Sequence, residues 1–342
     1  MGVFFIAEAG VNHNGDINIA LELIDVAAKS GADAVKFQTF KAIATVKAGT
    51  RTADYQKLHT AEDCQHALLD RLELSEGDHL LLAQRCAEQG IEFMSTAFDA
   101  SCADFLNSVG IQRIKIPSGE VTNLPFIRYL AATNLPIILS TGMATLAEIQ
   151  DAVDAIKQVR AKKKFPEPFA EICSILHCTS AYPTPRDQLN LKAITTLGAA
   201  FSCPVGYSDH SDGIEAAYLA VALGATVYEK HFTLDRTMSG PDHQASLEPE
   251  ELTQMIKNVR TASGMLGTGE KVPQPCEMEA RGLVRRSLYA ARDLPNGTII
   301  TPEDIIILRP PHGLAPKYYD ALLGKKLTRE ILTGGPFEME DL

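Results

Sequence analysis

Residues 136–156 read PIILSTGMATLAEIQDAVDAI and combine a short apolar run, a polar loop and an amphipathic segment. The run Pro136–Leu139 is typical of a buried strand. Thr145 and Glu148 have the spacing of a capping box, which predicts that a helix begins after Thr145. Helical periodicity then places four apolar side chains on one face: Leu146, Ile149, Val153 and Ile156. The stretch is a complete strand–loop–helix unit.

The same unit recurs along most of the chain, and a second clear amphipathic helix follows Glu248, with Leu252, Met255, Ile256 and Val259 on one side. Eight such units in about 265 residues match a TIM (β/α)8 barrel, for which about 250 residues are typical. A doubly wound open sheet is the structural alternative. The predicted strands are Val3–Ala7, Ala34–Gln38, Glu92–Ser95, Arg113–Ile116, Pro136–Leu139, Ile172–Leu176, Pro204–Tyr207 and Thr226–Lys230.

The repeated strand–loop–helix units predict a barrel over residues 1–266. Other stretches of the chain do not follow this repeat. The segment Lys41–Ser75 is too long for a simple loop, so we expect an excursion over the barrel mouth with a helix from about Ala61. The two glycines and two prolines of GTGEKVPQPCEMEAR indicate a linker over residues 267–282. Short apolar runs and tight turns then predict a small β-rich domain over residues 283–342.

Composition and cysteine usage exclude several classes of protein. The chain has 32 Lys and Arg against 43 Asp and Glu, a net charge of −11, which disfavours nucleic acid as a partner. Its seven cysteines form no CxxC and follow no signal peptide, so we expect reduced thiols in the cytoplasm. The longest uncharged stretch, from about Tyr129 to Ala147, is interrupted by Pro136 and Gly142 and predicts no membrane span.

Polar residues end nearly every predicted strand, where TIM barrels place their chemistry. A lysine within an apolar strand costs several kcal/mol unless it is paired or reaches a polar cavity. Lys36 and Lys115 are two such lysines on separate strands, and the alternative for each is an ordinary ion-pair partner. Because side chains at i and i+2 share a face, three pairs are expected to point the same way: Lys36 with Gln38, His177 with Thr179, and Glu229 with His231.

Two histidines are candidate metal ligands, because His210 and His231 end neighbouring predicted strands. The alternative is one structural and one exposed histidine. We expect His177 to form hydrogen bonds inside the mouth, and Cys178 to pack on the other side of its strand. Glu8 and Glu229 are candidate acid, base or orienting groups, which the sequence cannot rank.

This combination favours one kind of chemistry. Two lysines with several hydroxyls form an anion site, while the absence of GxxxxGK[ST] and GxGxxG argues against ATP and dinucleotides. A metal held by two histidines can polarise a carbonyl group. Together they suit carbon–carbon bond formation between an anionic enol donor and an aldehyde. A metal-dependent hydrolase would not need the lysines, and a sugar- or ice-binding module would leave the polar mouth unexplained.

Eight ordered motifs resemble the sialic acid (N-acetylneuraminate) synthase family, close to its legionaminic acid branch. They are AEAGVNHNGD (7–16), VKFQT (35–39), IKIPSGE (114–120), ILSTGM (138–143), HCTSAYPTP (177–185), GYSDHS (206–211), EKHFT (229–233) and GPDHQASLEP (240–249). The resemblance covers essentially the whole chain, and its tail is similar to the antifreeze-like (SAF) domain. It implies a transferase that condenses phosphoenolpyruvate with an open-chain N-acetylated aminosugar and uses a divalent cation, Mn²⁺ first and Mg²⁺ or Co²⁺ as alternatives.

The resemblance also implies roles for individual residues. His210 and His231 would bind the metal, and Glu120 would accept a proton. The phosphate and carboxylate of the donor would contact Lys36, Gln38, Thr96, Lys115, Ser118 and Ser140. The sugar side would involve Glu8, Tyr182 and Asp242, with Phe98 and His177 nearby in the mouth. Arg309 would reach the N-acetyl group from the other subunit of a domain-swapped homodimer.

The acceptor stays open at this stage. N-acetylmannosamine, which would give N-acetylneuraminate, is the first candidate. The alternative is 2,4-diacetamido-2,4,6-trideoxymannose, which would give N,N'-diacetyllegionaminate. Ser180 stands where one sialic acid synthase subgroup has asparagine, and two of the motifs resemble the legionaminic acid synthases.

Overall fold

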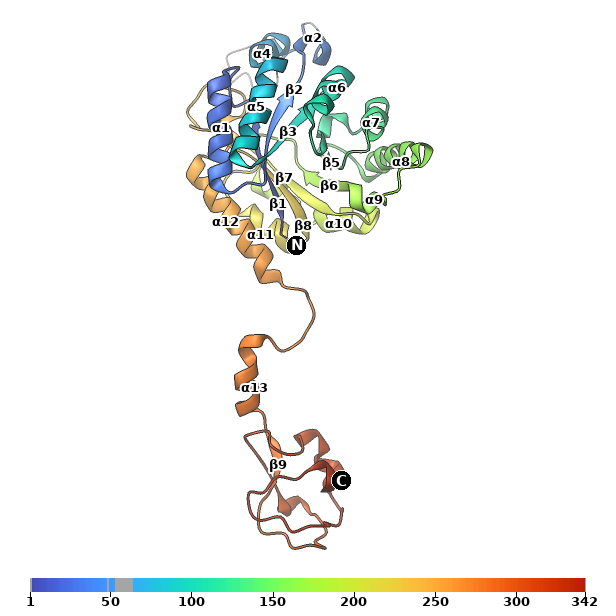
Figure 1. The fold of residues 1–342 in the computed structure, drawn as a ribbon, viewed down its shortest axis with the longest axis vertical. Helices are drawn as coiled ribbons and strands as arrows, with labels where there is room; N and C mark the ends of the chain where they lie inside the picture. The colour runs from blue at the N-terminus through green and yellow to red at the C-terminus, as the bar shows by residue number, and fades with distance from the viewer. Residues whose placement is uncertain (1, 48, 53–63, 342) are drawn as a thin grey trace. The chain divides into compact units, whose positions relative to one another are not determined.

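The computed structural model describes residues 2–47, 49–52 and 64–341. The chain forms two compact units, residues 1–267 and 268–342 (Figure 1). Each unit has its own hydrophobic core.

The first unit is a barrel of eight parallel strands. Around the barrel the strands follow the order β3-β2-β1-β8-β7-β6-β5-β4, with β3 next to β4. Because β1 pairs with β8 and the order follows the chain, the predicted TIM barrel is confirmed and the open doubly wound sheet is wrong. The strands are β1 Phe4–Gly10, β2 Ala34–Thr39, β3 Glu92–Ala97, β4 Ile114–Ile116, β5 Ile137–Ser140, β6 Cys173–Cys178, β7 Val205–Asp209 and β8 Ala225–His231.

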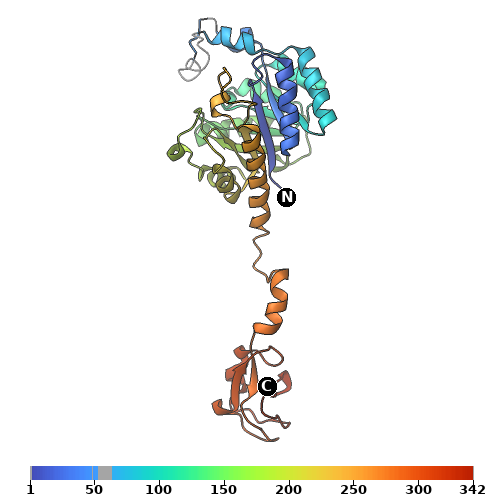
Figure 2. The ribbon, with the colours of Figure 1, turned by 90° about the vertical axis from the view of Figure 1, so that its left-hand side faces the viewer.

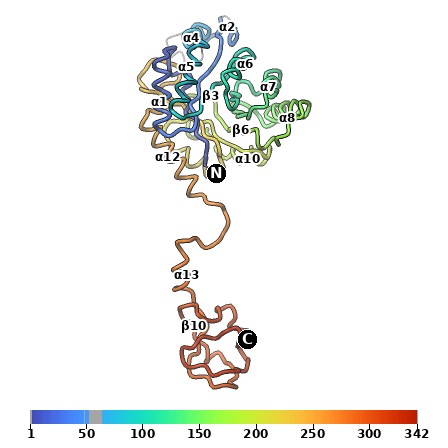
Figure 3. Tube along the Cα trace, viewed as in Figure 1, coloured from blue at the N-terminus to red at the C-terminus, as the bar shows by residue number. Residues whose placement is uncertain are grey.

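Helices surround these strands (Figures 2 and 3). Capping residues fix where several of them begin: Asp16 accepts from the Asn18 N–H, and Ser75 forms a capping box with Asp78. No helix among the described residues is both long and apolar enough to cross a bilayer. The helices of this unit are α1 Ile17–Ser30, α2 Ala42–Thr45, α4 Gln65–Leu72, α5 Glu76–Gln89, α6 Ala100–Val109, α7 Leu124–Ala131, α8 Leu146–Lys163, α9 Phe169–Ile172, α10 Ala193–Phe201, α11 Ala216–Ala222 and α12 Pro249–Leu266.

The predicted helices are found, with one error in the predicted face. The Thr145–Glu148 capping box begins α8, and the four apolar residues chosen for α12 are all buried. Leu146 of α8, however, is 48% exposed and lines a second cavity together with Ile149 and His177. Within the long excursion, α2 and α4 are observed, and the predicted helix start at Ala61 lies outside the described residues.

The barrel interior is layered, and this layering positions the site. A lower apolar layer consists of Ile6, Ala34, Met94, Ile138, Leu176 and Val227. Gly206 completes this layer on β7, where a Cβ would lie 2.3 Å from the Val227 carbonyl oxygen. Two residues further along the same faces come the residues of the next layer: Glu8, Lys36, Thr96, Ser140, Cys178, Ser208 and Glu229. The apolar layer therefore closes the cavity from below.

The second unit contains the antiparallel strands β9 Ser287–Ala290 and β10 Ile305–Leu308, with the short helix α14 Tyr319–Leu322. A tight turn at Asn296-Gly297 uses the positive φ of Gly297, 89°. Part of the predicted linker is helical, because α13 spans Met278–Val284. The small core includes Leu288, Leu294, Ile300, Leu327 and Phe337.

Candidate active site

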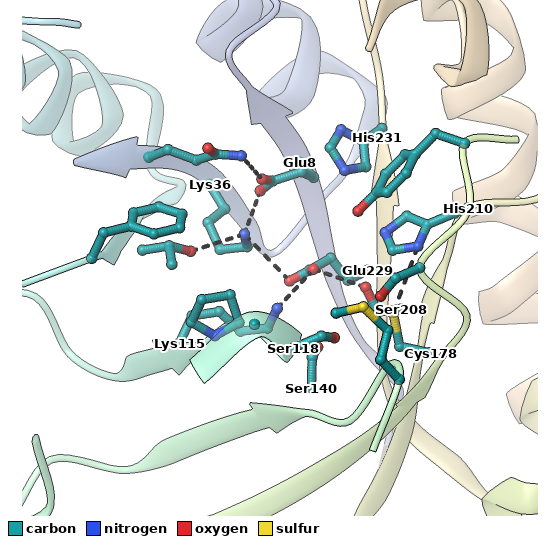
Figure 4. Close-up of a pocket in the computed structure, with 18 residues that line it drawn as sticks. Glu8, Lys36, Lys115, Ser118, Ser140, Cys178, Ser208, His210, Glu229 and His231 are labelled. Atoms are coloured by element: carbon teal, nitrogen blue, oxygen red, sulfur yellow. Dashed lines mark hydrogen bonds and ion pairs between the residues drawn. The ribbon is translucent and has the colours of Figure 1, made fainter. Parts of the chain in front are cut away.

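A cavity of about 370 Å³ lies at the carboxyl ends of the barrel strands (Figure 4). Its position is the one where TIM barrels carry their chemistry. Its lining is formed by Glu8, Lys36, Gln38, Thr96, Phe98, Lys115, Pro117, Ser118, Gly119, Ser140, Met143, Cys178, Ser180, Tyr182, Ser208, His210, Glu229 and His231.

One part of this cavity, the lysine side, consists of Glu8, Lys36, Lys115 and Glu229. Glu229 bridges the two lysines: its Oε1 lies 3.0 Å from Lys115 Nζ and its Oε2 3.7 Å from Lys36 Nζ. Lys36 Nζ is also 2.6 Å from Glu8 Oε2. All four side chains are at most 4% exposed, so the charges form one buried network.

Two further hydroxyls support this network. Lys36 donates to Thr96 Oγ1 at 3.2 Å, and Ser208 donates to Glu229 Oε1 at 3.0 Å. Ser140 Oγ is buried and has no hydrogen-bond partner among the described residues. A buried hydroxyl without a partner beside two ammonium groups suits an anionic ligand that would accept its hydrogen bond.

The two carboxylates of the lysine side have pKa values moved in opposite directions. Burial raises the pKa of Glu8 to about 7, against the lowering effect of Lys36. Burial also acts to raise the pKa of Glu229, but Lys115 and Lys36 outweigh it and bring the pKa to about 2. Glu229 is therefore a permanent anion, whereas Glu8 can gain or lose a proton near neutral pH.

The other part of the cavity, the histidine side, consists of Tyr182, His210 and His231, and the buried Asp242 lies beside His231 without lining the cavity. The ring centroids of His210 and His231 are 5.5 Å apart, and the Tyr182 ring lies 4.1 Å from that of His210. His210 Nδ1 is 2.8 Å from the Thr179 carbonyl oxygen and therefore carries a proton, so in the neutral imidazole the lone pair of Nε2 is open to a ligand.

The histidine side fits a divalent cation. His231 Nδ1 is buried with no hydrogen-bond partner among the described residues, and the nearest oxygen of Asp242 is 4.0 Å away. Burial, with His210 and Lys36 nearby, lowers the pKa of His231 well below its usual value, so the imidazole is neutral as a metal ligand must be. No cluster of three His, Cys, Asp or Glu suited to a metal occurs within the described ranges, so the protein would supply two histidines and leave positions open.

Four of the predicted site residues do not line this cavity. Asp242 lies beside His231 and is buried. Glu120 is not among the lining residues and accepts from Asn123 Nδ2 at 2.7 Å, and its role as a proton acceptor stays a prediction. Arg309 is an exposed residue of the second unit.

His177 is the fourth. The prediction that its side of β6 faces the mouth is wrong, because His177 points to the other face of the strand. It stacks on Tyr207, its Nε2 contacts the Leu189 carbonyl oxygen at 2.7 Å, and it lines a separate cavity. Cys178 lines the mouth instead, because it shares a face with Leu176 of the lower apolar layer. Both faces of β6 are apolar, so hydropathy gives no signal for its phase.

A comparison with protein families assigns the chain. The model described as the NeuB family matches residues 23–271. The chain belongs to the NeuB family. The SAF domain model matches residues 285–342 of this NeuB-family chain, so the resemblance of both parts is confirmed.

Two curated relatives are similar over nearly the full length. The N,N'-diacetyllegionaminic acid synthase of Legionella pneumophila is 48% identical, over 98% of this chain and 93% of the relative. The enzyme of the same name from Campylobacter jejuni is 45% identical over 95% of each. The crystal structure of the N-acetylneuraminic acid (sialic acid) synthetase of Leptospira borgpetersenii, in complex with citrate, is 38% identical, with a TM-score of 0.71 over 82% of this chain and 90% of that one. The NeuB-family chain is therefore an enzyme of the synthase class.

Proposed function

We propose that this enzyme condenses phosphoenolpyruvate with an open-chain acetylated aminosugar and releases phosphate. One observation carries the proposal: two buried lysines bridged by Glu229 lie in the same cavity as two histidines of which one is neutral and lacks a partner. A hydrolase would have no use for the lysine side. The acceptor we propose is 2,4-diacetamido-2,4,6-trideoxymannose, supported by the two synthases at 48% and 45% identity.

The lysine side would hold the donor. Lys36 and Lys115 attract its phosphate and carboxylate, and Ser118 and Ser140 provide hydroxyls on the adjoining strand ends. The donor replaces part of the contact between the lysines and Glu229. Because the apolar layer closes the cavity below, the anion exchanges its water for fixed protein donors, which strengthens each contact.

The histidine side would hold the acceptor. His210 and His231 are the proposed ligands of Mn²⁺, with Mg²⁺ or Co²⁺ as alternatives, and such a cation supplies Lewis-acid polarisation of a carbonyl group. Tyr182 and Asp242 border the space where the sugar chain would lie. Glu8, on the lysine side, is the ladder partner of His231 and so borders the histidine side, where it would contact a sugar hydroxyl.

The reaction balances without a redox partner. C3 of the donor forms the new bond to the aldehyde carbon, and the aldehyde oxygen takes up a proton. A water oxygen adds to C2 of the donor and becomes the keto oxygen as the bond from C2 to the phosphate oxygen breaks. Of the two protons of this water, one goes to the aldehyde oxygen and the other leaves with the phosphate. Glu8, whose pKa is about 7, is the group of the lysine side able to exchange a proton near neutral pH.

Three further expectations stay predictions. Arg309 would serve the sugar end of a partner's barrel in a domain-swapped homodimer, and the enzyme would work in the cytoplasm.

To test the dimer, His231→Ala and Arg309→Ala chains are mixed under conditions that exchange subunits. Swapped tails would restore about a quarter of the activity, because one site in each hybrid is complete. If each tail served its own barrel, no hybrid site would be complete and no activity would return.

Phosphate release from phosphoenolpyruvate with Mn²⁺ tests the function directly. The reaction is run with the diacetamido sugar, with N-acetylmannosamine and without sugar. Release that depends on the diacetamido sugar supports the proposal, whereas faster release with N-acetylmannosamine would assign the enzyme to N-acetylneuraminate synthesis. Release without sugar would indicate a hydrolase, and no release in any reaction would contradict the synthase.

A further inference from the structure

A second buried charge network lies behind the two histidines, on the faces of β7 and β8 that point away from the cavity. Asp209 and Lys230 are both 0% exposed, and Lys230 Nζ lies 3.2 Å from Asp209 Oδ2. The two residues are direct partners in the parallel ladder. Neither lines the mouth, although Ser208, His210, Glu229 and His231, their chain neighbours, all do.

Asp209 is saturated with donors. The Tyr228 hydroxyl donates to its Oδ2 at 2.6 Å, and the backbone N–H and hydroxyl of Ser211 donate to its Oδ1 at 2.8 and 2.6 Å. Lys230 in turn donates to the Ser211 carbonyl oxygen. The network therefore ties the residues on both sides of His210 to the residue before His231.

Such a network is not needed for stability as such. A buried ion pair is often replaceable by apolar residues of similar volume without loss of stability, because burial of the charges offsets their attraction. What the pair provides is a fixed geometry: Asp209 and Lys230 are ladder partners, and each directly precedes one of the two histidines. Gly206, three residues before Asp209, lets β7 approach β8 closely, because a Cβ at this position would lie 2.3 Å from the Val227 carbonyl oxygen.

We infer that the Asp209–Lys230 pair, with Tyr228 and Ser211, is a positioning unit that sets the separation of His210 and His231 for a divalent cation. The inference rests on the proposed metal role of those histidines. Groups that hydrogen-bond to metal ligands typically change metal affinity about 10- to 100-fold when removed, and this pair, which acts through the backbone, should show the lower end of that range. The pair would act through the histidines and touch neither substrate.

The test measures Mn²⁺ binding to the full-length protein by the loss of the free Mn²⁺ signal in electron paramagnetic resonance. The double variant Asp209→Asn/Lys230→Met removes both charges at nearly constant volume, which avoids leaving one buried charge unpaired. We expect its Mn²⁺ dissociation constant to rise at least about 10-fold, with turnover recovering at high Mn²⁺. Tyr228→Phe, which removes a single hydrogen bond to Asp209, should raise the dissociation constant about 3-fold.

Arg160→Met is the matched control. Arg160 is also buried and donates to Asn134 Oδ1 at 2.8 Å, but it lies about 20 Å along α8 from the mouth end of that helix. It should lower the melting temperature without changing Mn²⁺ affinity. If the double variant and Tyr228→Phe both bind Mn²⁺ as wild type does, the inference is overturned while the metal site stands. A wild-type protein that binds no Mn²⁺ would overturn the metal assignment and this inference together, whereas Mn²⁺ binding without sugar-dependent phosphate release would overturn the proposed reaction alone.

Discussion

The lysine side of the cavity is more deeply buried than the histidine side, and the two also differ in how their polar groups are satisfied. On the lysine side every ammonium group contacts a carboxylate, and Glu229 is shared by both lysines. On the histidine side the Nδ1 of His231 has no partner among the described residues, and Asp242 stops 4.0 Å short of it.

This difference indicates two modes of binding. Both ammonium groups of the lysine side are already paired with carboxylates, so an anion must compete with these carboxylates and its affinity depends on their charge. The histidine side is incomplete, since a buried nitrogen without a partner costs about 1–3 kcal/mol until something fills the position. Substitutions on the lysine side should therefore weaken donor binding in a graded way. Substitutions on the histidine side should abolish metal binding altogether.

His231→Ala should have the largest effect on turnover, because it removes the imidazole nitrogen of the histidine side that is buried without a partner in the described part of the chain. We expect turnover to fall about 1,000-fold with the melting temperature little changed, since the lost nitrogen makes no internal hydrogen bond. Steady-state kinetics with Mn²⁺ and thermal unfolding measure both. His177→Ala is the control on a histidine outside the mouth and should keep turnover within about 3-fold. Near-normal turnover in His231→Ala would remove the histidine from the metal site.

Lys115→Met should have the next largest effect, and a graded one. Glu229 would keep Lys36 at 3.7 Å and the Ser208 hydroxyl, so the network survives in part. We expect kcat/KM for phosphoenolpyruvate to fall about 100-fold, with KM for the sugar nearly unchanged. Lys163→Met, an exposed lysine at the end of α8, is the control. A loss confined to the sugar KM would show that Lys115 does not hold the donor.

The pH dependence of donor binding should sharpen the contrast. Below pH 7 Glu8 is protonated and the lysine side carries a net positive charge; above pH 7 Glu8 ionises and cancels it. The phosphoenolpyruvate dissociation constant, measured by calorimetry without sugar, should therefore rise about 5-fold between pH 6 and 8. Glu8→Gln fixes the neutral form and should remove that part of the dependence. An identical pH dependence in the variant would assign it to the ligand alone.

The strands could be predicted from the sequence because their short apolar runs recur between helical segments, and the polar mouth because polar residues end nearly every run. Lys36 and Lys115 stood out since charged side chains interrupt apolar strands. The phase of β6 could not be predicted, because its two faces are equally apolar. The prediction for the two faces of β6 is therefore wrong: it places His177 in the mouth and Cys178 outside it, whereas Cys178 lines the mouth.

The central position of Glu229 was also beyond the sequence. It contacts Lys36 on β2 and Lys115 on β4, which lie far from β8 along the chain and meet it only across the closed barrel. Periodicity places a side chain on a face of its own strand, whereas contacts across the barrel depend on strand tilt and side-chain length. Glu229 was a candidate without rank for this reason.

Ser208→Ala should have the smallest effect and tests whether the two sides are independent. Ser208 donates to Glu229 at 3.0 Å, and His210 follows it by two residues on the same face. Loss of one hydrogen bond to a charged group should weaken phosphoenolpyruvate binding about 3-fold, because Glu229 then holds the lysines more tightly. Mn²⁺ affinity should not change, since the network behind His210 is intact. A parallel loss of Mn²⁺ affinity would show that β7 couples the two sides, and the division into a graded and an all-or-none side would fail.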